Sequence, residues 1–446
     1  MYNPLLLPDL RQMIEENDTL GLKEFCEALY PGVTAEVLDG LDPDDIWRVL
    51  ANCSLERQVE IIEYMDLPLQ SELVENLDRE HLSKLLEKMA PDDRADLLAR
   101  MPERVEDLLP LIAHAERADI RRLLSYPEES AGSIMTTDYA SLPEDITVGE
   151  ALDQLRLQAP DRETIYYVYI VDEGRRLRGI LTLRELILAK PDTLISEISS
   201  RDVISVRVDD DQEYVVQELA KYNFIAIPVV DNQNQLVGIV THDDALDIVQ
   251  EEADEDALLA AAVQPMEDSY LDTPLATIAW SRGIWLVFLM GAAMVTAAVL
   301  KRYEDMPATF KWMIAFIPLV LACGGNVGAQ SATLVIRAMA LEKLSGSENM
   351  RMIRREVLLA GLLGGTLAAF SFLFAWLAFG HNRAEAAVVS LSVLLVVLTG
   401  TVAGAVLPIS FKRIGMDPAL MSNPLLAALV DVVGVLIFYN VAIWLL

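Results

Sequence analysis

Residues 423–439 read NPLLAALVDVVGVLIFY, an apolar run with a single acid, Asp431, inside it. The apolar segment continues to Leu446, and about 20 such residues are what a helix needs to cross a bilayer. An ionised carboxylate at that depth costs roughly 3 kcal/mol or more, so Asp431 is expected to face a partner, a water-filled path or an ion. The bland alternative is a neutral or hydrogen-bonded Asp that holds helices together. The stretch predicts a membrane protein with a functional acid in its last span.

Small or oxygen-bearing side chains recur on the face of that helix that carries the acid. Asn423, Ala427 and Asp431 are spaced i, i+4 and i+8, and Gly434 follows three residues later, so all four share one face. Bulky leucine would be expected on a face that only packs, and we therefore interpret this face as the wall of a pore. Asp417, in the turn before the span, is a candidate acidic inner mouth, although a plain turn residue explains it nearly as well.

A second unusual stretch, CGGNVGAQS, occupies residues 323–331 of another apolar run. Its glycines let backbones approach closely or let the helix unwind. Open backbone at membrane depth is tolerated only where it is buried in protein or lines an aqueous cavity. Ordinary packing of small residues between helices is the equally weighted alternative.

Apolar runs long enough to span a membrane predict five helices, near 283–300, 312–336, 357–380, 386–411 and 422–446. Five spans place the two termini on opposite sides. Eight Lys and Arg fall in the segments that share a side with the amino terminus and four in the others, which favours a cytoplasmic amino terminus. The eight are Arg282, Arg337, Lys343, Arg351, Arg354, Arg355, Lys412 and Arg413, and the four are Lys301, Arg302, Lys311 and Arg383.

Charge divides the chain in the same way. Only eight of the 68 acids and twelve of the 35 Lys and Arg lie beyond residue 275, so the front half is strongly acidic and the back half slightly basic. Such an acidic surface excludes nucleic acid as a partner and favours cations. The three cysteines show no disulfide or zinc-ligand spacing, which fits a reducing cytosol, and no cleavable signal peptide is visible. The four histidines are scattered and no nucleophile has a base beside it, so no enzyme is predicted.

Hydrated magnesium fits the few polar residues found in the apolar runs. The ion keeps several waters and usually takes one or two carboxylates from a protein. One Asp per chain is sparse, but a two-fold dimer would set two Asp431 side chains around one axis. A potassium-type filter would instead need rings of backbone carbonyls.

The acidic half contains two kinds of repeat. Between residues 37 and 110, short units such as SLERQVEIIEYM (54–65) recur about every twelve residues with apolar residues on one face, which predicts a small helical superhelix. Between 137 and 250, a helix, β-branched strands and a second helix occur twice, which predicts a small parallel or mixed sheet in each copy.

The second repeat resembles a pair of cystathionine-β-synthase (CBS) modules. The family's Gly-hydrophobic-x-Thr-x-x-Asp stretch, which cradles a nucleotide, is matched at 238–244; the first copy has Glu185 where Asp is usual. The resemblance implies an adenine-nucleotide site, and a purely structural module is weighed equally. The candidate nucleotide contacts are Tyr167, Arg184, Glu185, Phe224 and Thr241.

Along essentially its whole length the chain resembles the MgtE family of bacterial magnesium channels. The landmarks are SYPEESAGSIMTTDY (125–139), HDDALDIVQEEADEDA (242–257), GGNVGAQSATLVIRAMA (324–340) and DPALMSNPLLAALVDVVG (417–434). The resemblance implies a homodimer in the bacterial inner membrane, surrounded by lipid, with the pore on the dimer axis. Asp431 would select the ion, and Asn423, Ala427 and Gly328 would line its path.

The resemblance also implies a feedback gate in which cytosolic magnesium bridges acidic surfaces and closes the pore. Independently, residues 243–256 hold eight acids, many spaced i+3 or i+4, where like charges repel and a divalent cation would relieve the repulsion. A solvated acidic helix is the commoner explanation of a charge run alone. Asn223 stands where some members are expected to have Asp, which weakens one site. The candidate ligands are Glu60, Asp93, Asp96, Asp211, Glu213, Asp244, Asp247, Glu252, Glu255 and Asp256.

The predicted architecture is an acidic helical domain (1–130), a tandem CBS domain (131–250), a connecting helix (251–275) and a five-helix membrane domain (276–446). Pro265 is expected to end or kink the connecting helix. The predicted function is a magnesium-selective channel or transporter gated by cytosolic Mg²⁺, with ATP as a further candidate ligand. The rivals are an ion-coupled secondary transporter of divalent cations and a nucleotide-responsive membrane sensor that conducts nothing.

Overall fold

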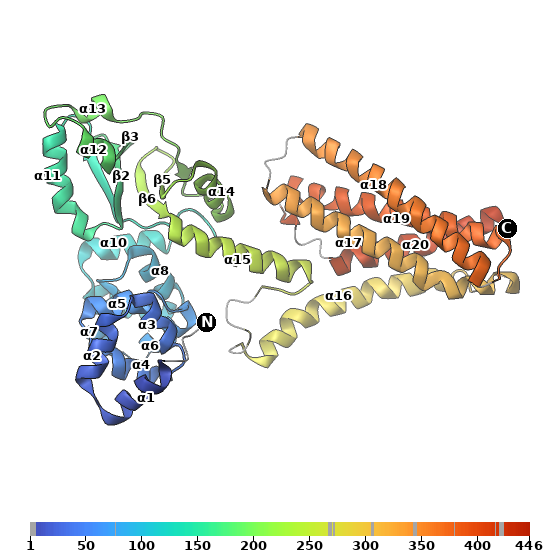
Figure 1. Ribbon diagram of the computed structural model, residues 1–446, viewed down its shortest axis with the longest axis horizontal. Coiled ribbons are helices and arrows are strands. Elements are labelled where there is room, and N and C mark those ends of the chain that lie inside the picture. Colours follow the sequence, from blue (N-terminus) through green and yellow to red (C-terminus); the bar gives the residue numbers. More distant parts are fainter. Residues whose placement is uncertain are drawn as a thin grey trace. The chain divides into compact units, whose positions relative to one another are not determined.

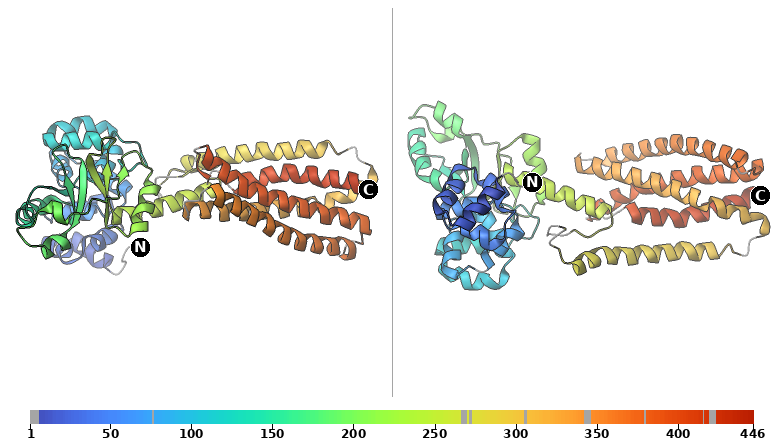
Figure 2. Two further views of the ribbon diagram at one scale, coloured as in Figure 1. Left: turned by 90° about the horizontal axis from the view of Figure 1, so that it is seen from above. Right: turned by 60° about the horizontal axis from the view of Figure 1, so that its bottom comes forward.

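The computed structural model describes residues 6–75, 77–265, 270, 273–304, 307–341, 346–378, 380–414, 416–418 and 423–446. The chain forms two compact units, Met1–Gln250 and Glu251–Leu446, which are drawn in Figures 1 and 2 and described separately below.

Short α-helices build the first part of the amino-terminal unit. Prolines at the first helical position start α3, α4, α8 and α9, where their missing N–H is no loss. Leu, Ile and Val from successive helices form one continuous core, which confirms the predicted helical domain. The helices are α1 Leu7–Glu16, α2 Thr19–Ala28, α3 Pro31–Leu38, α4 Pro43–Leu50, α5 Leu55–Ile62, α6 Leu67–Glu75, α7 Arg79–Leu86, α8 Pro91–Ala99, α9 Pro102–Leu108 and α10 His114–Leu123.

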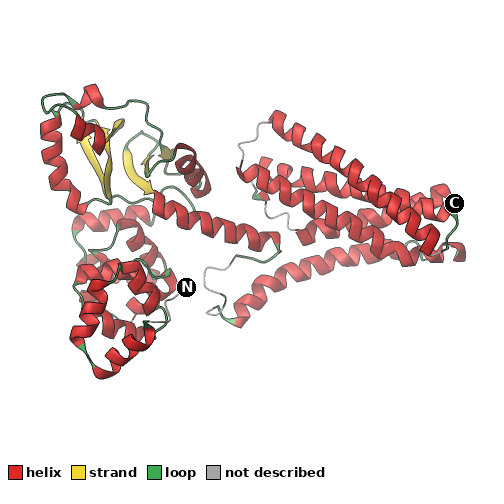
Figure 3. Cartoon of the chain, viewed as in Figure 1, coloured by secondary structure: helices red, strands yellow, loops and turns green. Residues whose placement is uncertain are grey.

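The tandem α/β repeat follows, and Figure 3 shows its two small sheets. Each sheet has three strands: the first pairs parallel with the second, and the second antiparallel with the third. The sheets are therefore mixed, as expected, with a leading strand (β1 or β4) that the repeat pattern did not indicate. The first copy comprises β1 Tyr139–Pro143, α11 Val148–Gln158, β2 Thr164–Val171, β3 Leu177–Thr182 and α12 Leu183–Leu188; after α13 Ile195–Ile198, the second comprises β4 Val206–Arg207, α14 Gln212–Tyr222, β5 Ala226–Val230, β6 Leu236–Thr241 and α15 His242–Ala260.

The two copies share a core. Tyr139 and Tyr169 of the first copy pack with Ala226 and Ile239 of the second, and the Tyr139 hydroxyl donates to the Leu236 carbonyl across 2.9 Å. The repeat is thus one packed body in which the strands of both copies face each other.

The last helix of the repeat corrects the prediction for the connecting segment. The connecting helix was expected over 251–275, but α15 starts at His242, directly after strand β6, and ends at Ala260. Ala262 adopts a left-handed backbone conformation with φ of 57°, so the helix ends before Pro265 is reached.

In its described residues the carboxy-terminal unit contains five helices long and apolar enough to span a membrane, as predicted. After a 3₁₀ segment at Ala308–Phe316, α17 begins, and α18 ends in a π-helical turn at Phe374–Ala378. The helices are α16 Leu275–Lys301, α17 Ile317–Leu341, α18 Gly346–Leu373, α19 Arg383–Arg413 and α20 Asn423–Leu445. The core of the unit is formed chiefly by α17, α19 and α20.

Glycines set the spacing of α17 and α19. A Cβ atom on Gly404 would overlap the carbonyl oxygen of Gly328, and one on Gly400 would overlap that of Gly324. Because the backbones touch, no side chain fits between them at these positions. α17 runs as a continuous helix through residues 323–331, so the unwinding considered for this stretch is wrong and close helix packing is what the glycines provide.

Candidate functional site

A group of carboxylates gathers in the amino-terminal unit, where the helical domain meets the CBS repeat. Asp92 and Asp93 lie on the first turn of α8, positioned by Pro91. Glu63 follows the end of α5, Asp244 lies on the first turn of α15, and Glu163 precedes β2. We call these five residues the acidic cluster. Their charges act on one another, although they come from four separate segments.

Burial and mutual repulsion disfavour the ionised forms of these acids. Burial first, then the carboxylates of Glu63 and Asp244, raise the pKa of Asp93 to about 8. Burial raises the pKa of Glu63 to about 7, against a hydrogen bond of 2.9 Å from the Ala90 N–H. Burial followed by the charge of Asp244 raises the pKa of Asp92, whose Oδ1 is buried and has no hydrogen-bond donor in the described residues.

Basic side chains do not neutralise the cluster. Arg94, on the same turn of α8, is 1% exposed and pairs with Glu116 at 2.8 Å. Arg57 pairs with Glu60, also at 2.8 Å. A bound proton or a bound cation can compensate the charge, and the cation is the one that remains above the raised pKa values of these acids. Oxygen ligands suit Mg²⁺. In the described ranges no group of three acids, histidines or cysteines is close enough to form a ready-made metal site, so the cluster would have to draw together around an ion or hold a hydrated one.

The predicted regulatory acids distribute unevenly. Asp96 and Asp244 both act on Asp93 at the cluster. Asp247 lies near Asp243, and burial and then that charge raise its pKa. Glu60 lies at the margin, where its charge acts on Glu63.

Asp211 and Glu213 have structural roles at the start of α14. The Asp211 carboxylate caps this helix by accepting from the Glu213 N–H at 2.9 Å, and Glu213 accepts from Gln217 at 3.1 Å. Asn223 ends the same helix with a left-handed φ of 53°, a conformation that Asn tolerates better than most residues. This backbone conformation is compatible with Asn223.

The acids of the second half of α15 belong to the carboxy-terminal unit. Glu252 and Glu255 are partly exposed and Asp256 is exposed. Partial desolvation and then the Asp417 carboxylate raise the pKa of Asp256. Asp417, predicted as an inner mouth, thus lies in the electrostatic range of the predicted regulatory acid Asp256.

Sequence reasoning missed Glu63, Asp92 and Glu163. Asp92 had a visible signal, because PDD at 91–93 is a helix start with paired acids. Glu63 and Glu163 had none, since only the fold brings a helix end and a strand start to the same place.

The candidate nucleotide residues surround the ends of β3 and β6. The Thr241 hydroxyl hydrogen-bonds the Asp244 carboxylate. In the first copy Thr182 makes the equivalent bond to Glu185 at 2.7 Å, so Glu replaces Asp without loss of the bond. The rings of Tyr167 and Phe224 meet edge to face at 6.2 Å. Arg184 is exposed and directly precedes Glu185 in the sequence.

In the membrane unit, Asp431 is half-buried on α20, eight residues after the helix start at Asn423. No hydrogen-bond donor or base contacts its carboxylate in the described part of the chain. Ala427, one turn earlier, packs on Gly325 of α17, and Gly328 packs on Gly400 of α19. The small residues of the predicted pore face thus pack α20 against α17, and Gly434 on the same face is buried against Leu321.

A second acid of the spanning helices, Glu356 of α18, was not singled out from the sequence. Its carboxylate lies 2.7 Å from the Ser331 hydroxyl, which in turn lies 3.2 Å from the Thr401 carbonyl. This network joins α18, α17 and α19, and it fixes the Glu356 side chain towards the helix bundle.

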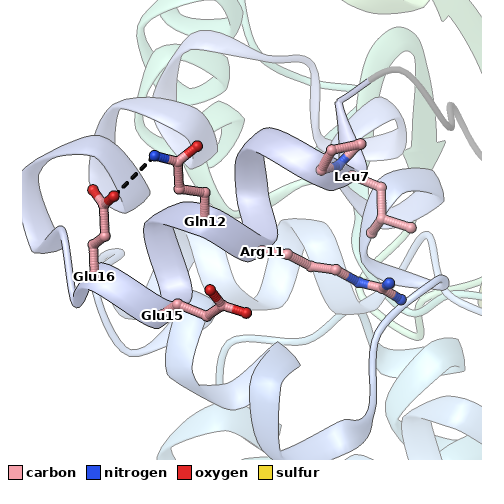
Figure 4. Close-up of a pocket in the computed structure, with 6 residues that line it drawn as sticks. Leu7, Arg11, Gln12, Glu15 and Glu16 are labelled. Atoms are coloured by element: carbon pink, nitrogen blue, oxygen red, sulfur yellow. Dashed lines mark hydrogen bonds between the residues drawn. The ribbon is translucent and has the colours of Figure 1, made fainter.

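A shallow pocket on the surface of α1, shown in Figure 4, is unrelated to these residues. It is lined by side chains of a single helix, and Gln12 donates to Glu16 across it at 2.8 Å. Its lining residues are Leu7, Pro8, Arg11, Gln12, Glu15 and Glu16.

Known proteins and family models match this chain along almost its whole length. A family model described as a divalent cation transporter matches residues 317–441, one described as the MgtE intracellular N domain matches 29–129, and the CBS domain model matches 131–192 and 195–251. The magnesium transporter MgtE of Thermus thermophilus is 40% identical over 443 residues, 98% of each chain. That of Enterococcus faecalis is 37% identical over 73% of this chain and 71% of its own. The crystal structure of the cytosolic domain of the Mg²⁺ channel MgtE in complex with ATP is 38% identical, covers 55% of this chain and all of its own, and superposes with a TM-score of 0.52.

Proposed function

Because the chain belongs to the MgtE family, we propose that this magnesium transport protein conducts Mg²⁺ past Asp431 and is closed by Mg²⁺ bound at the acidic cluster. The protein is a multi-pass membrane transporter and not an enzyme. We place it in the bacterial inner membrane with the acidic unit in the cytoplasm, as the excess of bases in the predicted inner segments favours.

The unpaired carboxylate of Asp431 carries the proposal for the ion path. It lies about 12 Å along α20 from Asn423, too deep to be an interfacial residue, and it has no protein partner in the described residues. Hydrated magnesium would meet Asp431 through water, with Asn423 and the mouth residue Asp417 along the route. Ala427 and Gly328 would support this route by holding α17 close to α20 and α19. In a homodimer two Asp431 carboxylates would share one axis, which gives a divalent ion the charge that one chain lacks.

Replacing Asp431 by Ala tests this path. Magnesium uptake into vesicles should fall to the background of protein-free vesicles, while Asp417→Ala, which removes only charge at the mouth, should reduce the rate and keep uptake. Uptake by Asp431→Ala at the wild-type rate would refute the assignment. The mass of the detergent-solubilised protein, measured by light scattering, tests the homodimer.

The gate is proposed from the electrostatics of the acidic cluster. Where its acids are ionised and no cation is bound, the carboxylates repel one another and favour separation of α8 from α15 and the β2 start. A divalent ion would reverse that preference, so high cytosolic Mg²⁺ would populate the compact, closed arrangement. Asp96, Asp247, Glu252, Glu255 and Asp256 would extend the acidic surface along α15. Asp211 and Glu213 contribute less to this proposal, since both act at the start of α14.

Single-channel recording in bilayers tests the gate and separates the rival functions. Unitary magnesium currents that disappear as cytosolic Mg²⁺ rises support a gated channel, stoichiometric counter-ion flux supports a coupled transporter, and absence of any flux supports a sensor. Joint replacement of Asp244, Asp247 and Glu255 by the corresponding amides should leave currents at Mg²⁺ concentrations that close the wild type.

We further propose that ATP binds the CBS repeat. The support is the relative's cytosolic domain in complex with ATP, together with the Thr241–Asp244 bond at the motif and the Tyr167–Phe224 ring pair. Calorimetric titration with ATP should show binding that Thr241→Val and Phe224→Ala weaken. Unchanged binding in both variants would contradict this site.

A further inference from the structure

Exposed bases converge on three packed helices at the inner end of the membrane unit. The end of α17, the start of α18 and the end of α19 meet in a small apolar cluster that includes Met339, Met352 and Ile409. The Lys412 ammonium donates to the Met339 carbonyl at 3.3 Å. The bases around this cluster are all exposed and none forms an ion pair with a described acid: Arg337, Arg351, Arg354, Arg355, Lys412 and Arg413.

The arginine trio of α18 (Arg351, Arg354 and Arg355) is the densest part of this surface. The neighbouring acid in sequence, Glu356, does not neutralise it, because its carboxylate is held by Ser331 on the opposite, inward side. A general excess of bases on the cytoplasmic side is usual in membrane proteins. Three arginines within five residues, exposed and without an acid partner, go beyond that tendency and leave a concentrated positive charge.

The level of the trio in the membrane follows from the length of α18. The span Glu348–Ala378 contains 31 residues, which is about 46 Å of helix against a hydrocarbon thickness of ~30 Å. Arg355 lies 23 residues before Ala378, about 35 Å along the axis. The trio is therefore placed just beyond the hydrocarbon, at the level of lipid headgroups.

An apolar strip on the same helical face continues from the trio into the membrane. Leu358 and Leu362 are 76% and 67% exposed, and a Cβ atom added to Gly361 or Gly365 would meet no atom within 4 Å. We call Leu358, Gly361, Leu362 and Gly365 the acyl strip. Their spacing from the arginines keeps all of them on one broad face. Gly364, by contrast, faces Leu394 of α19, so the open side of α18 is the side that carries the trio.

We propose that this face of α18 is a binding site for an anionic phospholipid, with the headgroup phosphate on the arginine trio and an acyl chain along the acyl strip. Guanidinium groups bind phosphate oxygens in a bidentate manner, and the missing side chains at 361 and 365 leave room for a chain beside the helix. The bound lipid would also neutralise positive charge at the end of the pathway where Mg²⁺ must pass, and this functional part depends on the proposed magnesium transport.

The test uses full-length protein reconstituted in phosphatidylcholine vesicles with or without phosphatidylglycerol. Retained phosphatidylglycerol is counted by native mass spectrometry after extraction in detergent, and magnesium uptake is measured separately. Each arginine near a bilayer contributes roughly fivefold to the affinity for an anionic surface. The triple variant R351Q/R354Q/R355Q should therefore retain phosphatidylglycerol about 10²-fold more weakly. The matched control is K301Q/R302Q, which removes two bases at the carboxy-terminal end of α16. This variant should retain phosphatidylglycerol like the wild type.

Two further variants guard against misfolding and against other occupants. R351K/R354K/R355K keeps the charge and should keep most of the retention, whereas G361L/G365L fills the acyl strip and should lower it with the trio intact. Equal retention by the triple variant and the wild type, or an equal loss in K301Q/R302Q, would overturn the site. So would a change of oligomer mass in G361L/G365L without loss of lipid, because a second copy would then cover the strip.

Uptake distinguishes a lipid from a free anion. Phosphatidylglycerol should raise magnesium uptake by the wild type and not by the triple variant, and inorganic phosphate added to neutral vesicles should not replace it. Rescue by inorganic phosphate would overturn the lipid assignment. Lipid retention is measured without magnesium, so a protein that retains phosphatidylglycerol and takes up no magnesium refutes the proposed transport and leaves the lipid site standing.

Discussion

Neutralising Asp93 should stabilise the magnesium-free cytosolic unit and reduce its response to pH. The pKa of Asp93 is about 8 in the folded chain against an ordinary value of 3.8, and that of Glu63 is about 7 against 4.5. Folded protein therefore binds more protons than unfolded protein between those limits. Stability from each group is fully present below its ordinary pKa and is lost as the pH rises through its folded pKa.

The magnitude follows from proton linkage. Between pH 6 and pH 8, loss of the proton from Asp93 should lower the free energy of unfolding by about 2 kcal/mol, and loss of the proton from Glu63 by about 1 kcal/mol. Asp93→Asn removes the first contribution outright. It also weakens the second, since the charge of Glu63 then has one repelling neighbour fewer.

The assay is urea unfolding of residues 1–250 without metal at both pH values. The wild type should be less stable at pH 8, and Asp93→Asn should show less than half of that loss. Asp192→Asn, an exposed acid outside the cluster, is the control and should match the wild type. Saturating Mg²⁺ should stabilise the wild type at pH 8 and have a smaller effect on Asp93→Asn. A wild type whose stability is the same at pH 6 and pH 8 would refute the electrostatic account of the cluster.

Three further predictions concern helix packing, a side-chain hydrogen bond and backbone strain. Gly404→Leu should destabilise the membrane unit by ~3 kcal/mol or prevent its folding, because the α17 carbonyl of Gly328 occupies the space. Thermal melting in detergent checks this. The control Gly291→Leu, whose side chain would enter open space, should melt like the wild type. Ser331→Ala should lower the melting temperature because its hydrogen bond to Glu356, worth about 1–3 kcal/mol, is lost. An unchanged melting temperature would show that this network does not stabilise the unit. Asn223→Ala should destabilise residues 1–250 by about 1 kcal/mol through its left-handed φ, whereas Asn223→Gly should not; equal urea midpoints for the two would count against backbone strain.

Membrane helices and repeats were predictable because their signals are local. Each span is a long apolar run, and the CBS copies alternate helix and strand with matching motifs, so period and length were sufficient. Strands β1 and β4 were not predicted, since they are short and gain stability only by pairing with β2 and β5. A helix after strand β6 was expected from the repeat, but its continuation past residue 250 to Ala260 was not, because no turn residue divides the acid-rich run.

The site was partly predictable for the same reason. Asp431 stands out because one acid in an apolar run is visible in the sequence itself. The acidic cluster depends on which acids the fold brings together: Asp93 and Asp244 are 151 positions apart, and Glu163 joins them from a strand start. Glu356 escaped notice because its importance rests on the Ser331 hydroxyl of another helix, which no spacing rule connects to it.

Helix α15 has a mechanical consequence. Its 19 residues form one unbroken helix about 28 Å long, with Asp244 on its first turn and Asp256 near its other end. A rotation of ~10° about the end near Asp244 would displace the other end by about 5 Å, comparable to one turn of helix. If the carboxylates near Asp244 moved, the helix would act as a lever that displaces its other end, and a glycine pair placed in its middle would decouple one end from the other.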